Sequence, residues 1–151
     1  MDGRIRELGI ADYDRLLALW RRSEGVVLRD ADSREAIARF LAHNPGLSFV
    51  LEEDGQILGA VLGGTDGRRG YLHHLAVDAG HRRRGFGRAL ASRAAEALVA
   101  RGIEKCHVMV LRTNAAARSF WASAGWEERA DLVLMSRTAG GRDASSRPSP
   151  V

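Results

Sequence analysis

The 151-residue chain has one cysteine, Cys106, and no apolar run near the roughly 18 residues of a membrane span. One cysteine cannot form an internal disulfide, so we expect a reducing compartment, the cytoplasm. The N-terminal residues 1–4 lack the apolar core of a signal peptide, and we predict no membrane partner. The five histidines show no zinc-type spacing with cysteine or aspartate, so we predict no metal site.

Lysine is also scarce, since Lys105 is the only one among 23 basic residues, and the formal net charge is +4. A basic chain suggests nucleic acid as a partner. However, the only run of three arginines is 82–84, and only Phe86 lies near it, whereas nucleic-acid surfaces usually interleave basic and aromatic residues. We therefore predict no nucleic-acid partner.

What is present predicts a mixed fold. Tyr13, Leu16 and Trp20 share one face of an amphipathic helix for which Asp12 is a suitable N-cap. Asp54-Gly55 between two apolar runs predicts a hairpin turn. The expected strands are 5–8, 48–53, 56–63, 71–77, 107–111, 126–129 and 132–137. Four helices are expected. The first spans 13–20, and the second begins at the capping sequence 32–35 and ends at 44–46. The third spans 85–101, and the fourth runs from Asn114 to Gly125. This order, β-α-α-β-β-β-α-β-α-β-β, predicts an α/β (α+β) fold with one central sheet.

The segment from Val77 to Leu90 ends a strand, continues as a basic loop with glycines and begins a helix. Helix-start N–H groups and the helix dipole attract anions, and glycine lets a phosphate approach the backbone. Two phosphate motifs do not fit. The dinucleotide pattern places Leu90 in its third glycine position, and the P-loop pattern places Phe86 and Gly87 where lysine and a hydroxyl residue are needed.

A third pattern, [RQ]-x-x-G-x-[GA], is met by Arg82, Gly85 and Gly87. It resembles the pyrophosphate loop of acetyltransferases related to the general-control histone acetylase, the GNAT superfamily. The likeness covers about residues 5–137 and is strongest with the small single-domain bacterial members. It also includes the strand end 75–77, Asn114 with Ala117 and the aromatic pair 120–121, and the pair 125–126.

This resemblance implies a GNAT fold with a mixed central sheet of six to seven strands and a V-shaped opening between strands 4 and 5. It implies a single acetyltransferase domain over 1–138, followed by a disordered tail over 139–151. Acetyl-CoA would be the donor. Main-chain groups of the strand end would pair with the pantetheine arm, and amides of the loop would hold the pyrophosphate. The implied coenzyme contacts are Leu75, Ala76, Val77, Arg82, Arg83, Arg84, Gly85, Phe86, Gly87, Arg88, Ala89, Asn114, Ala117 and Trp121.

Acetyl transfer needs a neutral amine, a donor for the oxyanion and a proton for the leaving sulfur. A strand-end N–H around Leu75 is the predicted oxyanion donor. His73 is the predicted base, because an imidazole can take up a proton near neutral pH. Strand alternation predicts that Tyr71, His73, Leu75 and Val77 share one face, and that Leu72, His74 and Ala76 share the other.

Trp121 departs from the family pattern, in which a tyrosine at this place protonates the thiolate. An indole N–H does not give up its proton near neutral pH. Tyr71 or water would then take that part, so the catalytic prediction is His73 with Tyr71. The alternative is that the protein binds acyl-CoA without catalysis.

The predicted function is therefore N-acetyl transfer from acetyl-CoA to a primary amine by direct attack in a ternary complex. The acceptor would be a small-molecule amine or a peptide N-terminus. Glu24, Arg29, Asp30 and Asp32 lie near the first helices, on the side where family members bind the acceptor, and could contact a polar amine. The sequence leaves monomer and homodimer equally open.

Overall fold

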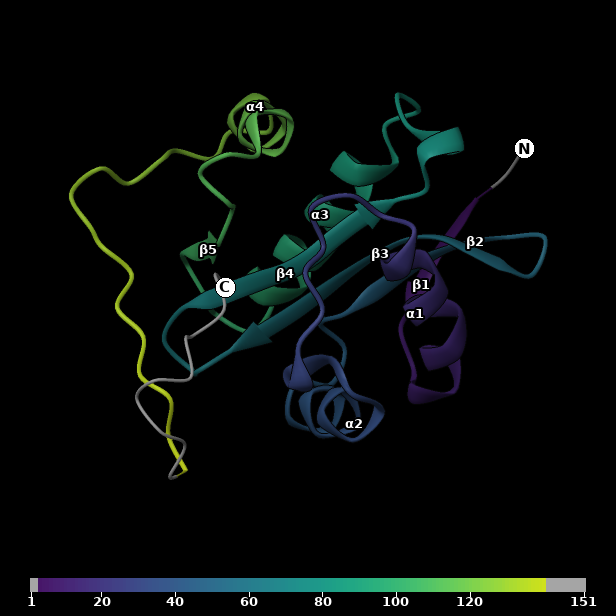
Figure 1. The fold of residues 1–151 in the computed structure, drawn as a ribbon, viewed down its shortest axis with the longest axis horizontal. Coiled ribbons are helices and arrows are strands. Elements are labelled where there is room, and N and C mark those ends of the chain that lie inside the picture. Colours follow the sequence, from purple (N-terminus) through teal and green to yellow (C-terminus); the bar gives the residue numbers. More distant parts are fainter. Residues whose placement is uncertain (1–2, 141–151) are drawn as a thin grey trace. The chain divides into compact units, whose positions relative to one another are not determined.

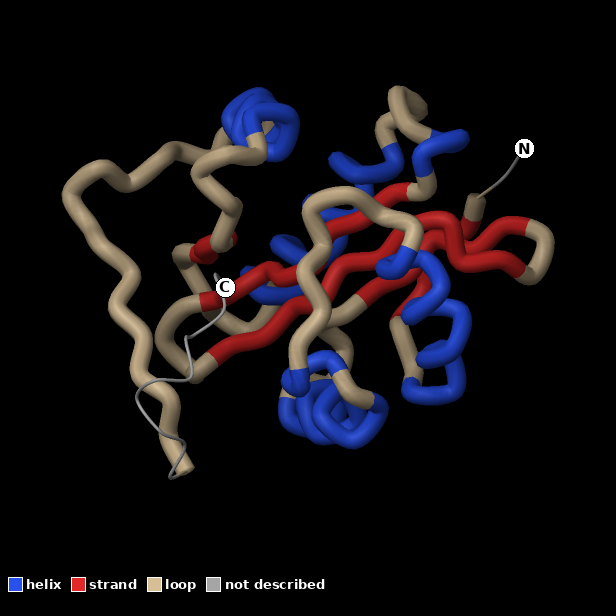
Figure 2. The backbone as a smooth tube through the Cα atoms, in the orientation of Figure 1, coloured by secondary structure: helices blue, strands red, loops and turns tan. Residues whose placement is uncertain are grey.

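A computed structural model describes residues 3–140, and its contacts divide the chain into two compact units, one up to Val108 and one from Met109. The first unit is a sheet with helices on both faces (Figures 1 and 2). The second unit contains one helix followed by a long segment without regular structure (Figure 2).

The sheet of the first unit has five strands in the order β1-β2-β3-β4-β5. The first four are antiparallel neighbours, and β5 runs parallel to β4. Their bounds are β1 Arg4–Glu7, β2 Phe49–Glu53, β3 Gln56–Thr65, β4 Gly70–Val77 and β5 Cys106–Val108. The predicted Asp54-Gly55 hairpin is confirmed, because both residues have the positive φ that this turn needs, 50° and 76°.

Helices cover both faces of this sheet. They are α1 Tyr13–Arg21, α2 Arg34–His43 and α3 Phe86–Val99, with short 3-10 turns η1 Ile10–Asp12, η2 Asp30–Asp32 and η3 Ala79–His81. Ala60 packs in one cluster with Leu16 and Trp20 of α1. A Cβ on the preceding residue, Gly59, would lie 2.8 Å from Leu90 of α3. Because successive strand residues face opposite ways, α1 and α3 lie on opposite faces.

Two predicted helix caps have different outcomes. The cap of α2 lies within the predicted capping sequence 32–35 and is Ser33, whose hydroxyl accepts from the Ala36 amide at 3.2 Å. Asp12 occupies the N-cap position of α1 as predicted, but its side chain makes no capping hydrogen bond to that helix. Its carboxylate accepts from the Gly9 amide at 2.9 Å and pairs with the guanidinium groups of Arg6 and Arg15 at 2.8 and 2.6 Å. Charged donors hold the carboxylate more strongly than a neutral helix amide would.

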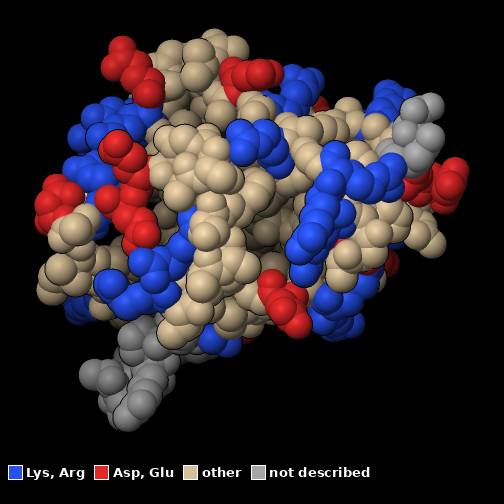
Figure 3. Space-filling model, turned by 90° about the horizontal axis from the view of Figure 1, so that it is seen from above, with Lys and Arg blue, Asp and Glu red and all other residues tan. Residues whose placement is uncertain are grey.

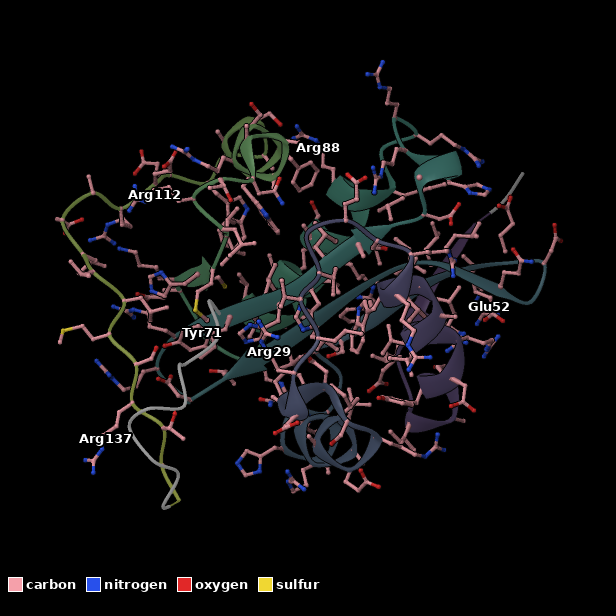
Figure 4. All side chains as sticks on the ribbon, in the orientation of Figure 1. Arg29, Glu52, Tyr71, Arg88, Arg112 and Arg137 are labelled. Carbon is pink, nitrogen blue, oxygen red and sulfur yellow. The ribbon has the colours of Figure 1, made fainter. Side chains whose placement is uncertain are left out.

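Arg6 also pairs with Glu52, which is labelled in Figure 4, at 2.5 Å. Arg15 reaches the same carboxyl at 3.3 Å. The two arginines and two carboxylates therefore tie β1, α1 and β2 together around the buried Asp12 side chain, which is 6% exposed.

In the second unit, α4 spans Ala115–Ser123, and Asn114 caps it as predicted, since Asn114 Oδ1 accepts from the Ala117 amide at 3.0 Å. The predicted strands 126–129 and 132–137 are wrong, so the described sheet has five strands instead of six to seven. Their apolar residues Leu132 and Val133 are 61% and 86% exposed. A strand needs a neighbour for its main-chain groups, and among the described residues neither segment pairs with another strand.

No helix within residues 3–140 combines the length and apolar character needed to span a membrane. Most of the predicted tail, 141–151, lies outside the described residues.

The ion pairs around Asp12 predict a loss of stability in acid. The Arg6 hydrogen bond is the main reason that the pKa of Asp12 falls from 3.8 to about 2, against the opposing effect of burial. A shift of nearly two units corresponds to about 2 kcal/mol of unfolding free energy, present above pH 4 or so and lost as the pH falls through about 2. Denaturant unfolding of Asp12→Asn should show a lower stability at neutral pH and a flatter acid limb.

Asp14→Asn is the control, since the Asp14 side chain is 92% exposed. Equal acid limbs in wild type and Asp12→Asn would contradict this account.

Candidate functional site

The site begins where β4 parts from β5. The parallel pairing joins only Gly70–Leu72 to Cys106–Val108. Among the described residues, β4 therefore continues from His73 to Val77 with β3 on one side and no strand on the other. Figure 2 shows β4 running on well past the short β5. This is the opening between strands 4 and 5 that the resemblance implies, and it leaves one strand edge with main-chain groups for a ligand.

A bulge lies at the start of that open edge. The β3–β4 register passes from Leu62 opposite His73 to Ala60 opposite Ala76, so residues 74 and 75 together face Val61. His74 has a left-handed backbone with φ 50°. One extra residue in a strand interrupts the hydrogen-bond ladder and reverses the sense of side-chain alternation beyond it.

The bulge brings both histidines to the face covered by α1 and α2. The His73 ring lies edge-on to Phe40 of α2, with ring centres 6.2 Å apart. The His74 ring lies edge-on to Trp20 of α1 at 5.1 Å.

The predicted alternation is therefore wrong for β4. Ala76 packs in the α1 cluster beyond the bulge, on the same face as His73. Leu75 and Val77, which alternate with Ala76, face the other way, so they do not share a face with His73. A one-residue bulge is enough to cause this change.

His73 lies between aromatic rings. Tyr71, labelled in Figure 4, stacks on His73 with ring centres 6.4 Å apart and planes 9° apart. Burial lowers the pKa of His73, the nearby His74 lowers it further, and the charge of Asp32 opposes both. The ring is therefore neutral at pH 7 and able to accept a proton.

His74 pairs with a carboxylate that sequence reasoning placed elsewhere. Its Nε2 lies 2.9 Å from Asp32 Oδ1, and the Asp32 side chain is only 10% exposed. Burial acts to raise the pKa of Asp32, but the hydrogen bond and charge of His74 outweigh it and the pKa is lowered. That Asp32 contacts the acceptor amine stays a prediction, and its contact with His74 was not predicted. No sequence spacing connects the two, because they meet only through the fold.

The loop after β4 has the geometry of an anion site. Arg83 and Gly85 have left-handed φ values of 66° and 80°, and α3 begins at Phe86. The Ala89 amide donates to Gly85 O at 3.0 Å. The first amides of a helix lie at the positive end of the helix dipole, where an anion is favoured.

Arginines surround the loop. Arg82 Nε donates to Val77 O at 3.2 Å, and the Arg84 guanidinium lies over the Phe86 ring, 4.6 Å from its centre. Arg82, Arg83, Arg84 and Arg88 are all exposed. They can add charge-assisted hydrogen bonds to a bound phosphate.

The loop is anchored by a carboxylate that the sequence did not single out. Asp78 Oδ1 accepts from Arg22 Nε at 2.8 Å, and its Oδ2 lies 2.9 Å from His81 Nδ1. The Arg22 hydrogen bond is the main reason that the pKa of Asp78 is lowered. These contacts tie the beginning of the loop to α1.

Three predicted coenzyme contacts belong to the second unit. Asn114 uses its carbonyl oxygen to cap α4. Trp121 packs edge-on against Phe120 at 5.2 Å and Trp126 at 4.9 Å. The coenzyme contacts of Asn114, Ala117 and Trp121 stay predictions.

Charge on the face in Figure 3 is mixed, with blue basic side chains interrupted by red acidic and neutral ones. Within the described range 3–140, no three or more His, Cys, Asp or Glu side chains gather in a way that could hold a metal ion.

Comparisons with known proteins agree on one family. Residues 13–126 match the model of the Acetyltransferase (GNAT) family. An acetyltransferase of Yersinia enterocolitica is 36% identical over 134 residues, which cover 88% of this chain and 94% of the relative. An acetyltransferase of Pectobacterium atrosepticum is 41% identical over 104 residues, which cover 68% and 72%.

Solved structures show the same fold. The PaiA N-acetyltransferase of Thermoplasma acidophilum, in complex with coenzyme A, has a TM-score of 0.73 at 21% identity, covering 82% of this chain and 88% of that one. The ribosomal-protein-S18-alanine N-acetyltransferase of Escherichia coli has a TM-score of 0.71 at 24% identity, covering 85% and 79%.

The contacts of His73 predict how its pKa responds to a neighbour. Because the charge of His74 lowers the pKa of His73, His74→Asn should raise it. Asparagine also tolerates the left-handed backbone at this position. NMR titration of the imidazole carbons should show His73 titrating below 6.5 in the wild type and at a higher pH in the variant. An unchanged or lower value in the variant would contradict the assigned contact.

Proposed function

The chain belongs to the Acetyltransferase (GNAT) family, and we propose that it moves the acetyl group of acetyl-CoA to a primary amine by direct attack in a ternary complex. Acetyl-CoA is the donor. The observation that carries the proposal is the open edge of β4, which leads directly into the basic loop and the start of α3. An extended arm ending in phosphates matches a strand edge that continues into an anion site.

In this proposal the coenzyme binds along that path. Main-chain groups of Leu75, Ala76 and Val77 pair with the pantetheine arm as a neighbouring strand would. Loop and helix-start amides hold the pyrophosphate, with the arginines around it. This set is Arg82, Arg83, Arg84, Gly85, Phe86, Gly87, Arg88 and Ala89. Asn114, Ala117 and Trp121 complete the proposed set.

His73 is the proposed proton acceptor. The acceptor amine must lose a proton to attack, and the lowered pKa keeps His73 neutral and ready to take it, directly or through water. A main-chain N–H around Leu75, at the bulge, donates to the carbonyl oxygen as negative charge develops there. Tyr71 or water supplies the proton for the leaving thiolate, since the Trp121 indole cannot.

The acceptor is proposed as a small amine or a peptide N-terminus. Structures of the same fold include an aminoglycoside acetyltransferase from a soil metagenomic sample in complex with sisomicin, at 21% identity, and the S18-alanine enzyme. They motivate both acceptor classes without choosing between them. The rival proposal is a protein that binds acyl-CoA without transfer, because Trp121 stands where many family members have a tyrosine.

The test combines calorimetry with a thiol-release assay. Wild-type protein should bind acetyl-CoA and release CoA faster than its slow background hydrolysis with at least one amine of a panel. The panel contains an aminoglycoside, a simple primary amine and a peptide with N-terminal alanine. Tight binding without transfer to any of them would favour the non-catalytic rival.

Gly85 should be needed for coenzyme binding. Its φ of 80° is costly for an L-residue, by roughly 1–2 kcal/mol, so Gly85→Ala should distort the loop. We expect about a tenfold higher Kd for acetyl-CoA, which corresponds to about 1.4 kcal/mol. Gly55→Ala is a matched control, because Gly55 has φ 76°, and a Cβ there would also meet open space, as at Gly85, but it lies in the β2–β3 turn. Equal Kd values in the two variants would contradict the loop assignment.

Replacing the proposed base should change the pH profile. The pKa of His73 is lowered from 6.5, so wild-type kcat/KM should fall in acid only below about that pH. His73→Gln should lower kcat by about 10²- to 10⁴-fold and remove this acid limb. His43→Gln, an exposed histidine at the end of α2, is the control. If His73→Gln kept both turnover and limb, another group would be the base.

A further inference from the structure

His74 is a strained residue inside a strand. Among the described residues, three non-glycine residues have a left-handed backbone: Asp54, His74 and Arg83. Asp54 lies in a hairpin turn and Arg83 in the loop between β4 and α3, and left-handed residues are common where the chain turns. His74 adopts it in the middle of β4, where the chain would otherwise be extended. A conformation of this kind persists only where surrounding contacts hold it in place.

The contacts that hold His74 come from α1 and from the connection between α1 and α2. Its Nε2 bonds Asp32 Oδ1 at 2.9 Å, and its ring packs edge-on to Trp20 at 5.1 Å. Asp32 is fixed in turn, since its Oδ2 accepts from the Arg29 amide at 3.0 Å and its backbone carbonyl from the Tyr13 hydroxyl at 2.6 Å. The connection between α1 and α2, which carries η2, crosses in front of β3 and β4 in Figure 1. Figure 4 labels Arg29 on this connection.

The strain falls at the point where the reaction needs a backbone donor. Residues 74 and 75 together face Val61, so the bulge takes part of its main chain out of the β3–β4 ladder. The β5 side is also open there, because the β4–β5 pairing ends at Leu72. The direction of these amides therefore depends on how the bulge is held, and the strand ladder alone does not fix it.

We propose that Asp32 and His74 are positioning residues, whose hydrogen bond fixes the β4 bulge so that its N–H groups meet the thioester carbonyl. This inference rests on the proposed function, because it deepens the account of the same site. The buried carboxylate holds the imidazole, the imidazole holds the left-handed backbone, and the backbone presents the donor. Neither side chain exchanges a proton with the acceptor amine.

The alternative is that Asp32 and His74 act as a base pair, with the carboxylate stabilising a protonated imidazole. Asp32→Asn separates the two roles. Asparagine can accept from the Arg29 amide through its oxygen and donate to His74 Nε2 through its nitrogen, so the link is kept. However, an asparagine donor at this position forces the His74 proton from Nε2 to Nδ1, and the substitution removes the negative charge of the carboxylate. Both changes abolish the function of a catalytic imidazole.

The experiment measures recognition of the carbonyl without requiring transfer. The probes are two CoA analogues. In the first, a methylene replaces the thioester sulfur and the ketone carbonyl is kept. In the second, a methylene also replaces the carbonyl. Calorimetry gives the ratio of their Kd values. For the wild type we expect the ketone to bind about five- to tenfold more tightly, as one hydrogen bond provides.

Asp32→Ala should reduce this ratio to about one, and Asp32→Asn should keep it close to the wild-type value. The Kd of the carbonyl-free analogue should stay within about twofold in every variant, since none of the substitutions lies in the loop and helix start 82–89. Asp14→Ala, on the exposed face of α1, is the matched control. If Asp32→Ala does not fold, as judged by circular dichroism, His74→Gly takes its place, because it removes the imidazole with its contacts to Asp32 and Trp20. Glycine adopts left-handed and extended backbones about equally, so without these contacts the bulge is no longer fixed.

Three results would overturn the proposal: a wild-type ratio of one, an unchanged ratio in folded Asp32→Ala or His74→Gly, or a ratio lost as completely in Asp32→Asn as in Asp32→Ala. The ratio is independent of any acceptor. A protein that shows the expected ratios yet transfers to no amine would therefore count against the proposed function and not against the positioning pair.

Discussion

β4 pairs with β5 over three residues, and beyond them no strand within residues 3–140 pairs with it on that side. An unpaired strand edge has main-chain N–H and C=O groups without partners, so a protein must cover the edge, block its pairing or bind a ligand there. Here the free edge, from His73 to Val77, leads straight into a loop of exposed arginines and the amide-rich start of α3. The same main chain thus offers strand-type pairing for an extended arm and helix-start amides for its phosphates. The rest of the site is arranged around this edge.

Local sequence patterns were enough for the parts of the fold that depend on local chemistry. Asp54-Gly55 forms its turn, Ser33 and Asn114 cap their helices, and the loop from Arg82 to Gly87 begins α3 as the motif indicated. Each of these outcomes is decided within a few residues of chain. This is why a pattern of residue types was sufficient to predict them.

The parts that the sequence did not reveal depend on contacts between distant segments. The left-handed residue of the bulge is His74 and not a glycine, so no residue type in the sequence marks the bulge. The bulge nevertheless places His73 and His74 on the same face of the sheet. Asp12 looks like a helix cap until two arginines compete for its carboxylate. The segment 132–137 has the composition of a strand, but among the described residues it has no strand to pair with. Asp32 and His74 are 42 positions apart, and only the fold brings them together.

Two neighbouring histidines of β4 have different surroundings. His73 lies among aromatic rings with a lowered pKa, which suits a neutral proton acceptor. His74 is tied to a buried carboxylate and holds the backbone in an unusual conformation. The two rings therefore suit different roles. They share one face of β4 because of the one-residue bulge at 74–75. Tyr71, which we propose as a proton donor to the thiolate in place of Trp121, stacks on His73 within the same strand.

The central claim is that the edge 73–77 and the loop 82–88 together bind the coenzyme. Hydrogen exchange of the backbone amides with and without CoA measures this directly. The account predicts slower exchange in both stretches on adding CoA, with little change in the β2–β3 hairpin around Gly55. Binding that slows exchange in neither stretch, or only elsewhere in the chain, would contradict it.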